Sequence, residues 1–137
     1  MTEKTVVDAL VQMKRTGNLL NEMEELTKQI GQSIDRNDQV SLQMLISMRE
    51  EPLGKLQAAD QAIRDQLELL PDKLEAAQLA SMLNGGPPAD PGAQVQQQLC
   101  EQVASNNRRL KQIIELDQQL NQRLGRENSA NWQSKSG

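Results

Sequence analysis

Three segments of this 137-residue chain carry apolar residues at alternating spacings of three and four, over 6–34, 42–74 and 99–124. That spacing places the side chains on one stripe of an α-helix, which is the seam of a coiled coil. Such a stripe has to be buried against another helix. The sequence therefore predicts an all-α fold, an elongated antiparallel bundle or coiled coil of three long helices plus a short Ala-rich helix.

The composition agrees with a narrow helical core. Apolar residues make up 36% of the chain, and there is no Phe or Tyr and only one Trp. An elongated bundle needs less core per residue than a compact globule does. The scarcity of aromatic residues also argues against a sheet, because aromatic side chains favour strands.

The first helix has recognisable ends. Thr2 can cap its start, and the polar run 35–37 should end it, after which Asn37 or Asp38 can cap the second helix. Gly17 interrupts the apolar stripe of the first helix. A glycine on the buried face would permit close approach of a neighbouring helix, and we expect that role if Gly17 faces the core.

Two prolines interrupt the second seam. Pro52 lies inside a periodic stretch that continues in phase across it, so we expect a kinked helix, with a break as the alternative. Pro71 suits the first position of the short Ala-rich helix, which reaches Leu83.

The run 84–92 holds three prolines and three glycines, which predicts a flexible, exposed linker. The third long helix should start near Ala93 and end at Gly125, which can serve as its C-terminal cap. The domain organisation expected is a helical bundle over 1–125 followed by a disordered polar tail over 126–137. The last helix should return to pack antiparallel to the second.

Several functions lack the residues that they need. The chain has no His and a single Cys, Cys100, which leaves no usual general base and no disulfide framework. We expect Cys100 to be a small buried apolar side chain, and the alternative is a reactive thiol. We expect no enzyme activity, no metal and no cofactor, and a reduced, cytoplasmic protein.

Charge and hydropathy argue against nucleic-acid binding and against a secretion signal or membrane span. The net charge is −4 and no basic stripe is present, so nucleic-acid binding is not expected. No uninterrupted apolar run reaches five residues, so we expect neither a signal peptide nor a membrane-spanning helix.

Polar residues occupy four positions of the seams, namely Arg49, Asp60, Asn106 and Asp117. A buried polar group without a partner costs about 1–3 kcal/mol. These side chains could sit at the rim of the bundle and reach out to water. Alternatively, they could pair across the bundle and fix the register of the helices. A catalytic role has nothing around these residues to support it.

Methionines recur along the helices, at Met13, Met23, Met44, Met48 and Met82. Methionine on an amphipathic helix usually fills a core. It also makes adaptable surfaces that bind helical partners, and both interpretations stay open here.

An acidic turn at 37–38 leads into a helix with an apolar pair at 45–46 and further leucines over 53–56. An Asn-rich stretch follows at 103–110, and an aromatic residue, Trp132, lies in the closing segment 130–137. In these features the sequence resembles flagellar export chaperones of the FlgN/FliT kind. The stretch 103–110 resembles the opening of that family's last helix, and 130–137 is similar to its closing aromatic tail, where the family commonly has Tyr in place of Trp132.

The resemblance implies a cytoplasmic type III export chaperone. Its partners would be the helical C-terminal segment of a hook-associated or filament-cap protein and a component of the export apparatus. Such a chaperone prevents premature association of its client and needs no cofactor. The alternative is a structural coiled-coil scaffold that self-associates without a client, and a homodimer stays open in either case.

The last helix is expected to supply most of the client-binding surface. The partner-binding residues that we predict are Leu99, Val103, Leu110, Ile113, Leu120 and Trp132. The five apolar residues of the helix could equally be the intramolecular core. Trp132 could dock on the export apparatus, as the resemblance suggests, or fold back on the bundle or stay exposed.

Overall fold

The computed structural model describes the backbone of residues 1–136 and the side chains of residues 1–125. The described backbone is helical apart from its turns, and it contains no strand. The helices in chain order are α1 (Glu3–Asp35), α2 (Gln39–Met48), α3 (Glu50–Leu69), α4 (Lys73–Leu83) and α5 (Gln94–Ser136). The all-α prediction is confirmed.

Helix α1 starts and ends where its sequence predicts. The Thr2 hydroxyl accepts a hydrogen bond from the Thr5 amide at the start. At the end Asn37 takes a left-handed conformation with φ 56°, and the amide of Asp38 donates to the carbonyl of Ser33. This arrangement satisfies carbonyls that a helix end leaves free. Asp38 then caps α2 by accepting from the Ser41 amide.

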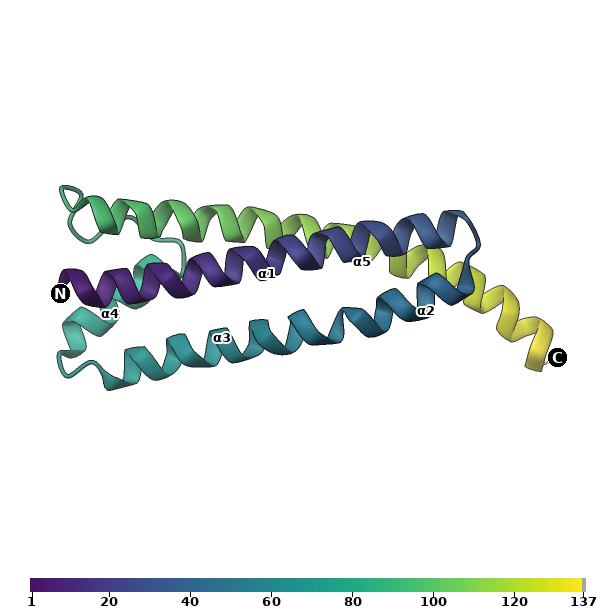
Figure 1. Cartoon of the computed structure of the whole chain (residues 1–137), viewed down its shortest axis with the longest axis horizontal. Helices are drawn as coiled ribbons and strands as arrows, with labels where there is room; N and C mark the ends of the chain where they lie inside the picture. Colours follow the sequence, from purple (N-terminus) through teal and green to yellow (C-terminus); the bar gives the residue numbers. More distant parts are fainter. Residues whose placement is uncertain (137) are drawn as a thin grey trace.

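The second seam is split into α2 and α3 by a one-residue interruption at Arg49. Pro52 lies four residues after Met48, the last residue of α2. A proline cannot donate to the carbonyl four residues before it, and its ring crowds that carbonyl. Arg49 keeps right-handed helical dihedrals, so α3 continues in nearly the direction of α2 (Figure 1). The result is the expected kink and not a wide break.

Helix α4 starts later than its sequence suggested. Pro71 is not its first residue, because α4 begins at Lys73. Asp72 takes the capping position instead, where its carboxylate accepts from the amides of Leu74 and Glu75. With Pro71 as the first helical residue, the cap would be Leu70, whose side chain cannot accept a hydrogen bond, whereas the Asp72 carboxylate can.

The Pro/Gly linker makes hydrogen bonds at both of its ends. Gly85 has φ 100°, and Gly86 donates to the Ser81 carbonyl, which closes the end of α4. The Asp90 amide donates to the Gln96 side chain, and the Asp90 carboxylate accepts from the Gly92 amide. The linker turns the chain in the predicted place, while its flexibility stays a prediction.

Helix α5 does not end at Gly125, as the sequence suggested, but continues to Ser136. Gly125 does not adopt the left-handed conformation that a C-terminal glycine cap requires. The tail predicted over 126–137, including Trp132, falls outside the residues whose side chains are described.

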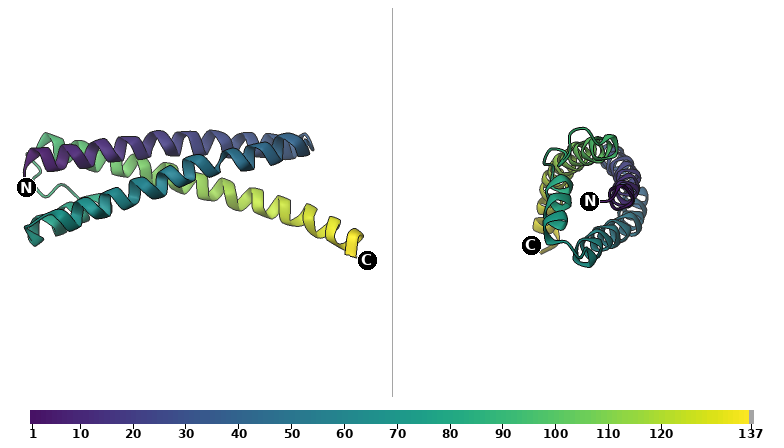
Figure 2. Two further views of the ribbon diagram at one scale, coloured as in Figure 1. Left: turned by 60° about the horizontal axis from the view of Figure 1, so that its bottom comes forward. Right: turned by 90° about the vertical axis from the view of Figure 1, so that its left-hand side faces the viewer.

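Helix α1 makes the most extensive contacts of any helix in the bundle, since it packs against α2, α3 and α5 (Figure 1). Met13 meets Asn106, and Asp35 meets Arg123, so α1 and α5 run in the same direction. Helices α2 and α3 run in the opposite direction to α1 and α5. Helix α4 packs between α3 and α5 at the end of the bundle where α1 begins (Figure 2). The predicted antiparallel packing of the last helix on the second seam is confirmed, because Leu45 shares a cluster with Leu120 and the later Leu56 shares one with the earlier Ile113.

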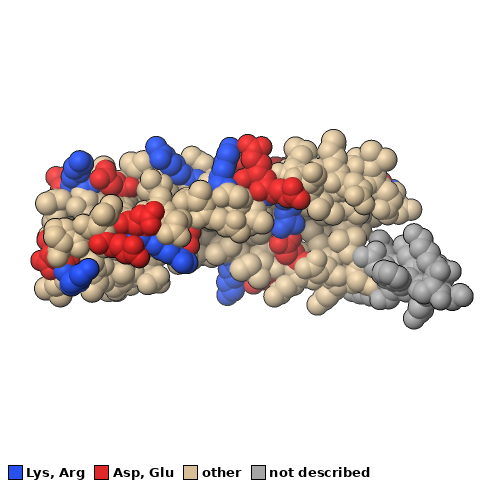
Figure 3. All heavy atoms as spheres, turned by 90° about the horizontal axis from the view of Figure 1, so that it is seen from below, with Lys and Arg blue, Asp and Glu red and all other residues tan. Residues whose placement is uncertain are grey.

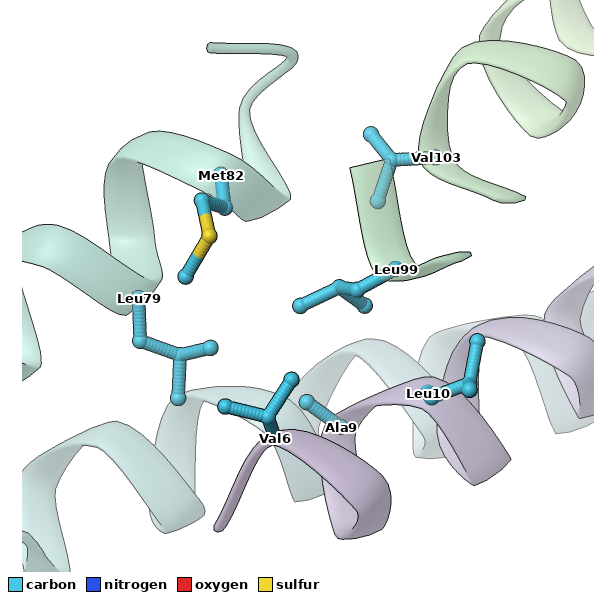
Figure 4. Close-up of a cluster of buried hydrophobic side chains, with 7 residues drawn as sticks. All are labelled: Val6, Ala9, Leu10, Leu79, Met82, Leu99 and Val103. Carbon is cyan, nitrogen blue, oxygen red and sulfur yellow. The ribbon is translucent and has the colours of Figure 1, made fainter. Parts of the chain in front are cut away.

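The core consists of three clusters along the bundle. The largest lies at the N-terminal end, where α1, α4 and α5 point their side chains to one centre (Figure 4). Its members are Val6, Ala9, Leu10, Leu79, Met82, Leu99 and Val103. The middle cluster holds only Leu20, Met23 and Ile113, and the third joins α1, α2 and α5 around Ile30.

Candidate partner-binding surface

A close contact between α1 and α5 sets the register of these two helices. Asn106 is 6% exposed and donates from its amide nitrogen to the Met13 carbonyl at 2.8 Å. Gly17 makes room for it, because a Cβ there would lie 2.9 Å from both Asn106 Oδ1 and Gln102 Nε2. Gly17 therefore permits the close approach that its position in the stripe suggested.

A second polar contact joins the kink to α5. The Arg49 guanidinium donates two hydrogen bonds to the two carboxylate oxygens of Asp117, at 2.9 and 2.8 Å. Both side chains are partly buried, at 24% and 33% exposure. Such a two-point geometry fixes orientation as well as distance.

The polar seam residues therefore divide between the two alternatives. Arg49, Asp117 and Asn106 make contacts across the bundle, which supports a role in register. Asp60 does not, because it is exposed and pairs with Arg64 one turn along the same helix at 2.9 Å.

The predicted partner-binding residues of α5 lie mostly inside the bundle. Leu99 and Val103 belong to the N-terminal cluster, Ile113 to the middle cluster and Leu120 to the third. Leu110 alone is on the surface, at 44% exposure. The stripe is buried because α1, α2 and α4 cover it, so a partner could reach those four side chains only if helices separated. Their role in partner binding stays a prediction.

Helix α2 leaves large apolar side chains in water. Val40 is 81% exposed and Met44 57%, and Ile46 and Met48 are about half exposed as well. The helix carries no Asp, Glu, Lys or Arg from Gln39 to Met48. The view from below shows few charged atoms over α2 (Figure 3). These residues lie off the seam, and their apolar character in an uncharged segment was a signal in the sequence.

The five methionines divide between the two roles considered for them. Met23 and Met82 are buried, and Met13 packs against the N-terminal cluster from its edge. Met44 and Met48 are on the surface of α2. Met13, Met23 and Met82 therefore help to fill the core, whereas Met44 and Met48 are available to form an adaptable surface on α2.

A second group of half-exposed apolar side chains lies where α3 and α5 flank α1. It consists of Leu53 on α3 with Leu110 and Ile114 on α5, exposed by 47%, 44% and 47%. We call these three residues the α3–α5 strip. Sequence reasoning included Leu110 but missed Ile114 and Leu53.

The titratable groups of the described region show no catalytic arrangement. Burial raises the pKa of the Cys100 thiol, which keeps it protonated, and the side chain packs at the edge of the N-terminal cluster. The hydrogen bond that the Lys55 ammonium donates to the Glu51 carboxylate raises the pKa of Lys55 on the surface of α3. Among the described residues, no group of His, Cys, Asp and Glu side chains is placed to hold a metal ion.

The helices of the described region include none that is long and apolar enough to cross a membrane. No family model, no curated protein and no solved structure matches the chain.

Proposed function

We propose that this chain is a chaperone without enzyme activity that binds a helical segment of another protein. The observation that carries the proposal is the surface of α2, where four large apolar side chains meet water on a helix without charged residues. Exposed apolar surface of this kind is typical of interaction sites. An apolar helix face offers a partner helix contacts at spacings of three and four.

The resemblance in 37–56 and 103–110 supports a more specific assignment. The client would be the helical C-terminal segment of a flagellar hook-associated or filament-cap protein. The chaperone would hold that segment in the cytoplasm and deliver it to the export apparatus, and it would need no cofactor.

A direct test measures binding and self-association together. Light scattering after gel filtration should give a monomer, and titration calorimetry with the C-terminal segment of a hook-associated protein should show saturable binding. A stable homodimer that does not bind the segment would contradict the proposal and favour a self-associating scaffold.

The proposed contact with the export apparatus can be tested at Trp132. Trp132→Ala should leave helicity, melting temperature and client affinity unchanged while it reduces secretion of the client. Normal secretion by this variant would remove the docking role, and a melting temperature lower by several degrees would identify Trp132 as a packing residue.

A further inference from the structure

We propose that the α3–α5 strip is the binding site for one amphipathic α-helix of a partner, which lies end to end with α4. The proposed function supplies the identity of that partner, and the location of the site comes from the packing of α3, α4 and α5.

The three residues of the strip lie together because of the Arg49–Asp117 contact. Arg49 touches Asp117, and α3 runs opposite to α5. Leu53 comes one turn after Arg49 along α3, and Ile114 comes about one turn before Asp117 along α5. Both therefore lie on the same side of the ion pair, and Leu110 lies one turn further along that face of α5.

The same two helices already bind a helix at their other end. Leu79 and Met82 of α4 pack against Leu99 and Val103 of α5, and Leu67 and Leu70 of α3 pack against the same cluster. Helix α4 thus occupies the place between α3 and α5 at the N-terminal end (Figure 2).

The strip continues that interface along both helices. Leu110 follows Val103 by one heptad on α5, so the face that contacts α4 extends to Leu110 and Ile114. The occupant that suits this continuation is a second helix of the kind that α4 represents, with leucine and methionine at spacings of three and four.

The available length sets the size of the partner helix. Ten residues separate Asn107, which lies beside Gly85 at the end of α4, from Asp117, where Arg49 closes the far end. At 1.5 Å per residue this is about 15 Å, which suits a helix of about 10 residues. The unfilled position also accounts for Asp60, a seam residue of α3 that stays in water and pairs only with Arg64 among the described residues.

A pair of double variants tests the location. Leu110→Glu with Ile114→Glu places two charges on the strip, and the matched control, Val7→Glu with Val11→Glu, places two charges on the outer surface of α1, where the two valines are 38% and 42% exposed. All four side chains are substantially exposed, so both variants should keep the helicity and melting temperature of the wild type. Circular dichroism checks this first.

Two probes are titrated into each protein. One is the C-terminal segment of a hook-associated protein, and the other is a hydrocarbon-stapled peptide with the sequence of α4, Lys73–Leu83. We expect the strip variant to weaken binding of both probes about 100-fold, which removes most of the affinity as charged substitution in a central contact does. The control should change it less than about 2-fold. Methyl NMR should show shifts at Leu53, Leu110 and Ile114 on binding.

The outcomes separate this inference from the proposed function. If the control variant loses the client and the strip variant keeps it, the site is wrong and the chaperone function stands. If the client does not bind but the α4 peptide does, and only the strip variant loses the peptide, the site stands and the flagellar assignment fails. If neither probe binds the wild type, the site is wrong.

Discussion

The N-terminal end of the bundle and its middle are held together by different interactions. At the end, α4 joins α1 and α5, and seven buried apolar residues form one cluster. In the middle, three buried residues with Leu56 at their edge form the cluster, and polar contacts surround them. Asn106 bonds to the backbone of α1, Arg109 pairs with Glu24 at 3.8 Å, and Arg49 pairs with Asp117.

The difference shows what a fourth helix contributes. Where α4 is present, α1 and α5 can bury apolar side chains on more than one side. Where α4 is absent, α5 retains the half-exposed Leu110 and Ile114, and the two helices rely on polar pairs, which give direction but less stability than burial does.

The largest expected effect compares the two clusters directly. Leu99→Ala should lower the free energy of unfolding by about 4 kcal/mol, because the leucine is fully buried among α1, α4 and α5. Ile113→Ala in the smaller cluster should cost about 2 kcal/mol, since water can more easily reach the space that it leaves. Urea titration followed by circular dichroism measures both. Equal losses would show that the middle is packed as well as the end.

The next largest effect is expected at the Arg49–Asp117 ion pair, which joins α5 to the kink between α2 and α3 near the middle of the bundle. Asp117→Ala leaves a partly buried Arg49 without its partner and should cost about 1–2 kcal/mol. Asp60→Ala is the matched control, because the Asp60–Arg64 pair is exposed and should be worth less than about 0.5 kcal/mol. A control that costs as much as Asp117→Ala would mean that the crossing contact has no special role.

Alanine substitutions at two glycines should change the free energy of unfolding by a smaller amount and in opposite directions. Gly17→Ala gains about 1 kcal/mol of helix propensity but pushes on Asn106 and Gln102, whose hydrogen bonds hold them in place, so we expect a net loss of about 1 kcal/mol. Gly54→Ala meets no atom within 4 Å and should stabilise α3 by about 1 kcal/mol. A gain in both variants would show that Asn106 can move aside without cost.

The smallest effect lies at the far end, where Asp38 caps α2. Hydrogen bonds from the Ser41 hydroxyl and amide lower the pKa of Asp38 in the folded protein. The stability that the ionised Asp38 carboxylate gives to the folded protein is fully present above the unfolded pKa of about 3.9. It is lost as the pH falls through the lower pKa of the folded state. Asp38→Asn keeps a capping side chain that does not titrate. The wild type should therefore lose its advantage over this variant between pH 5 and pH 2 in thermal melts.

Much of the fold follows from local chemistry that the sequence displays. The spacing of three and four identifies the helices, Asn37 and Asp38 mark the first turn, and Pro52 marks the kink. Gly125 shows where local reasoning fails, because a glycine ends a helix only if the chain there turns left-handed. Pro71 fails similarly, since Asp72 competes for the cap.

The partner-binding residues were harder to predict for a different reason. A buried stripe looks the same in a sequence whether its partner belongs to the same chain or to another protein. Leu99, Val103, Ile113 and Leu120 are covered by the chain's own helices, and nothing in their spacing could reveal it. The apolar residues of α2 were more informative, because they lie off the stripe in a segment without charges.

The parallel pairing of α1 with α5 has a consequence for folding during synthesis. The largest interface of the bundle joins α1 to α5, whose contacting residues are 93 positions apart in the chain at Met13 and Asn106, so α1 must wait until α5 has been synthesised. Until then α2 and α3 can cover only one side of it. Contacts so distant in sequence also slow folding, because the loop between them must close first. Chains that stop before α5 should therefore remain only partly folded and expose the stripe of α1.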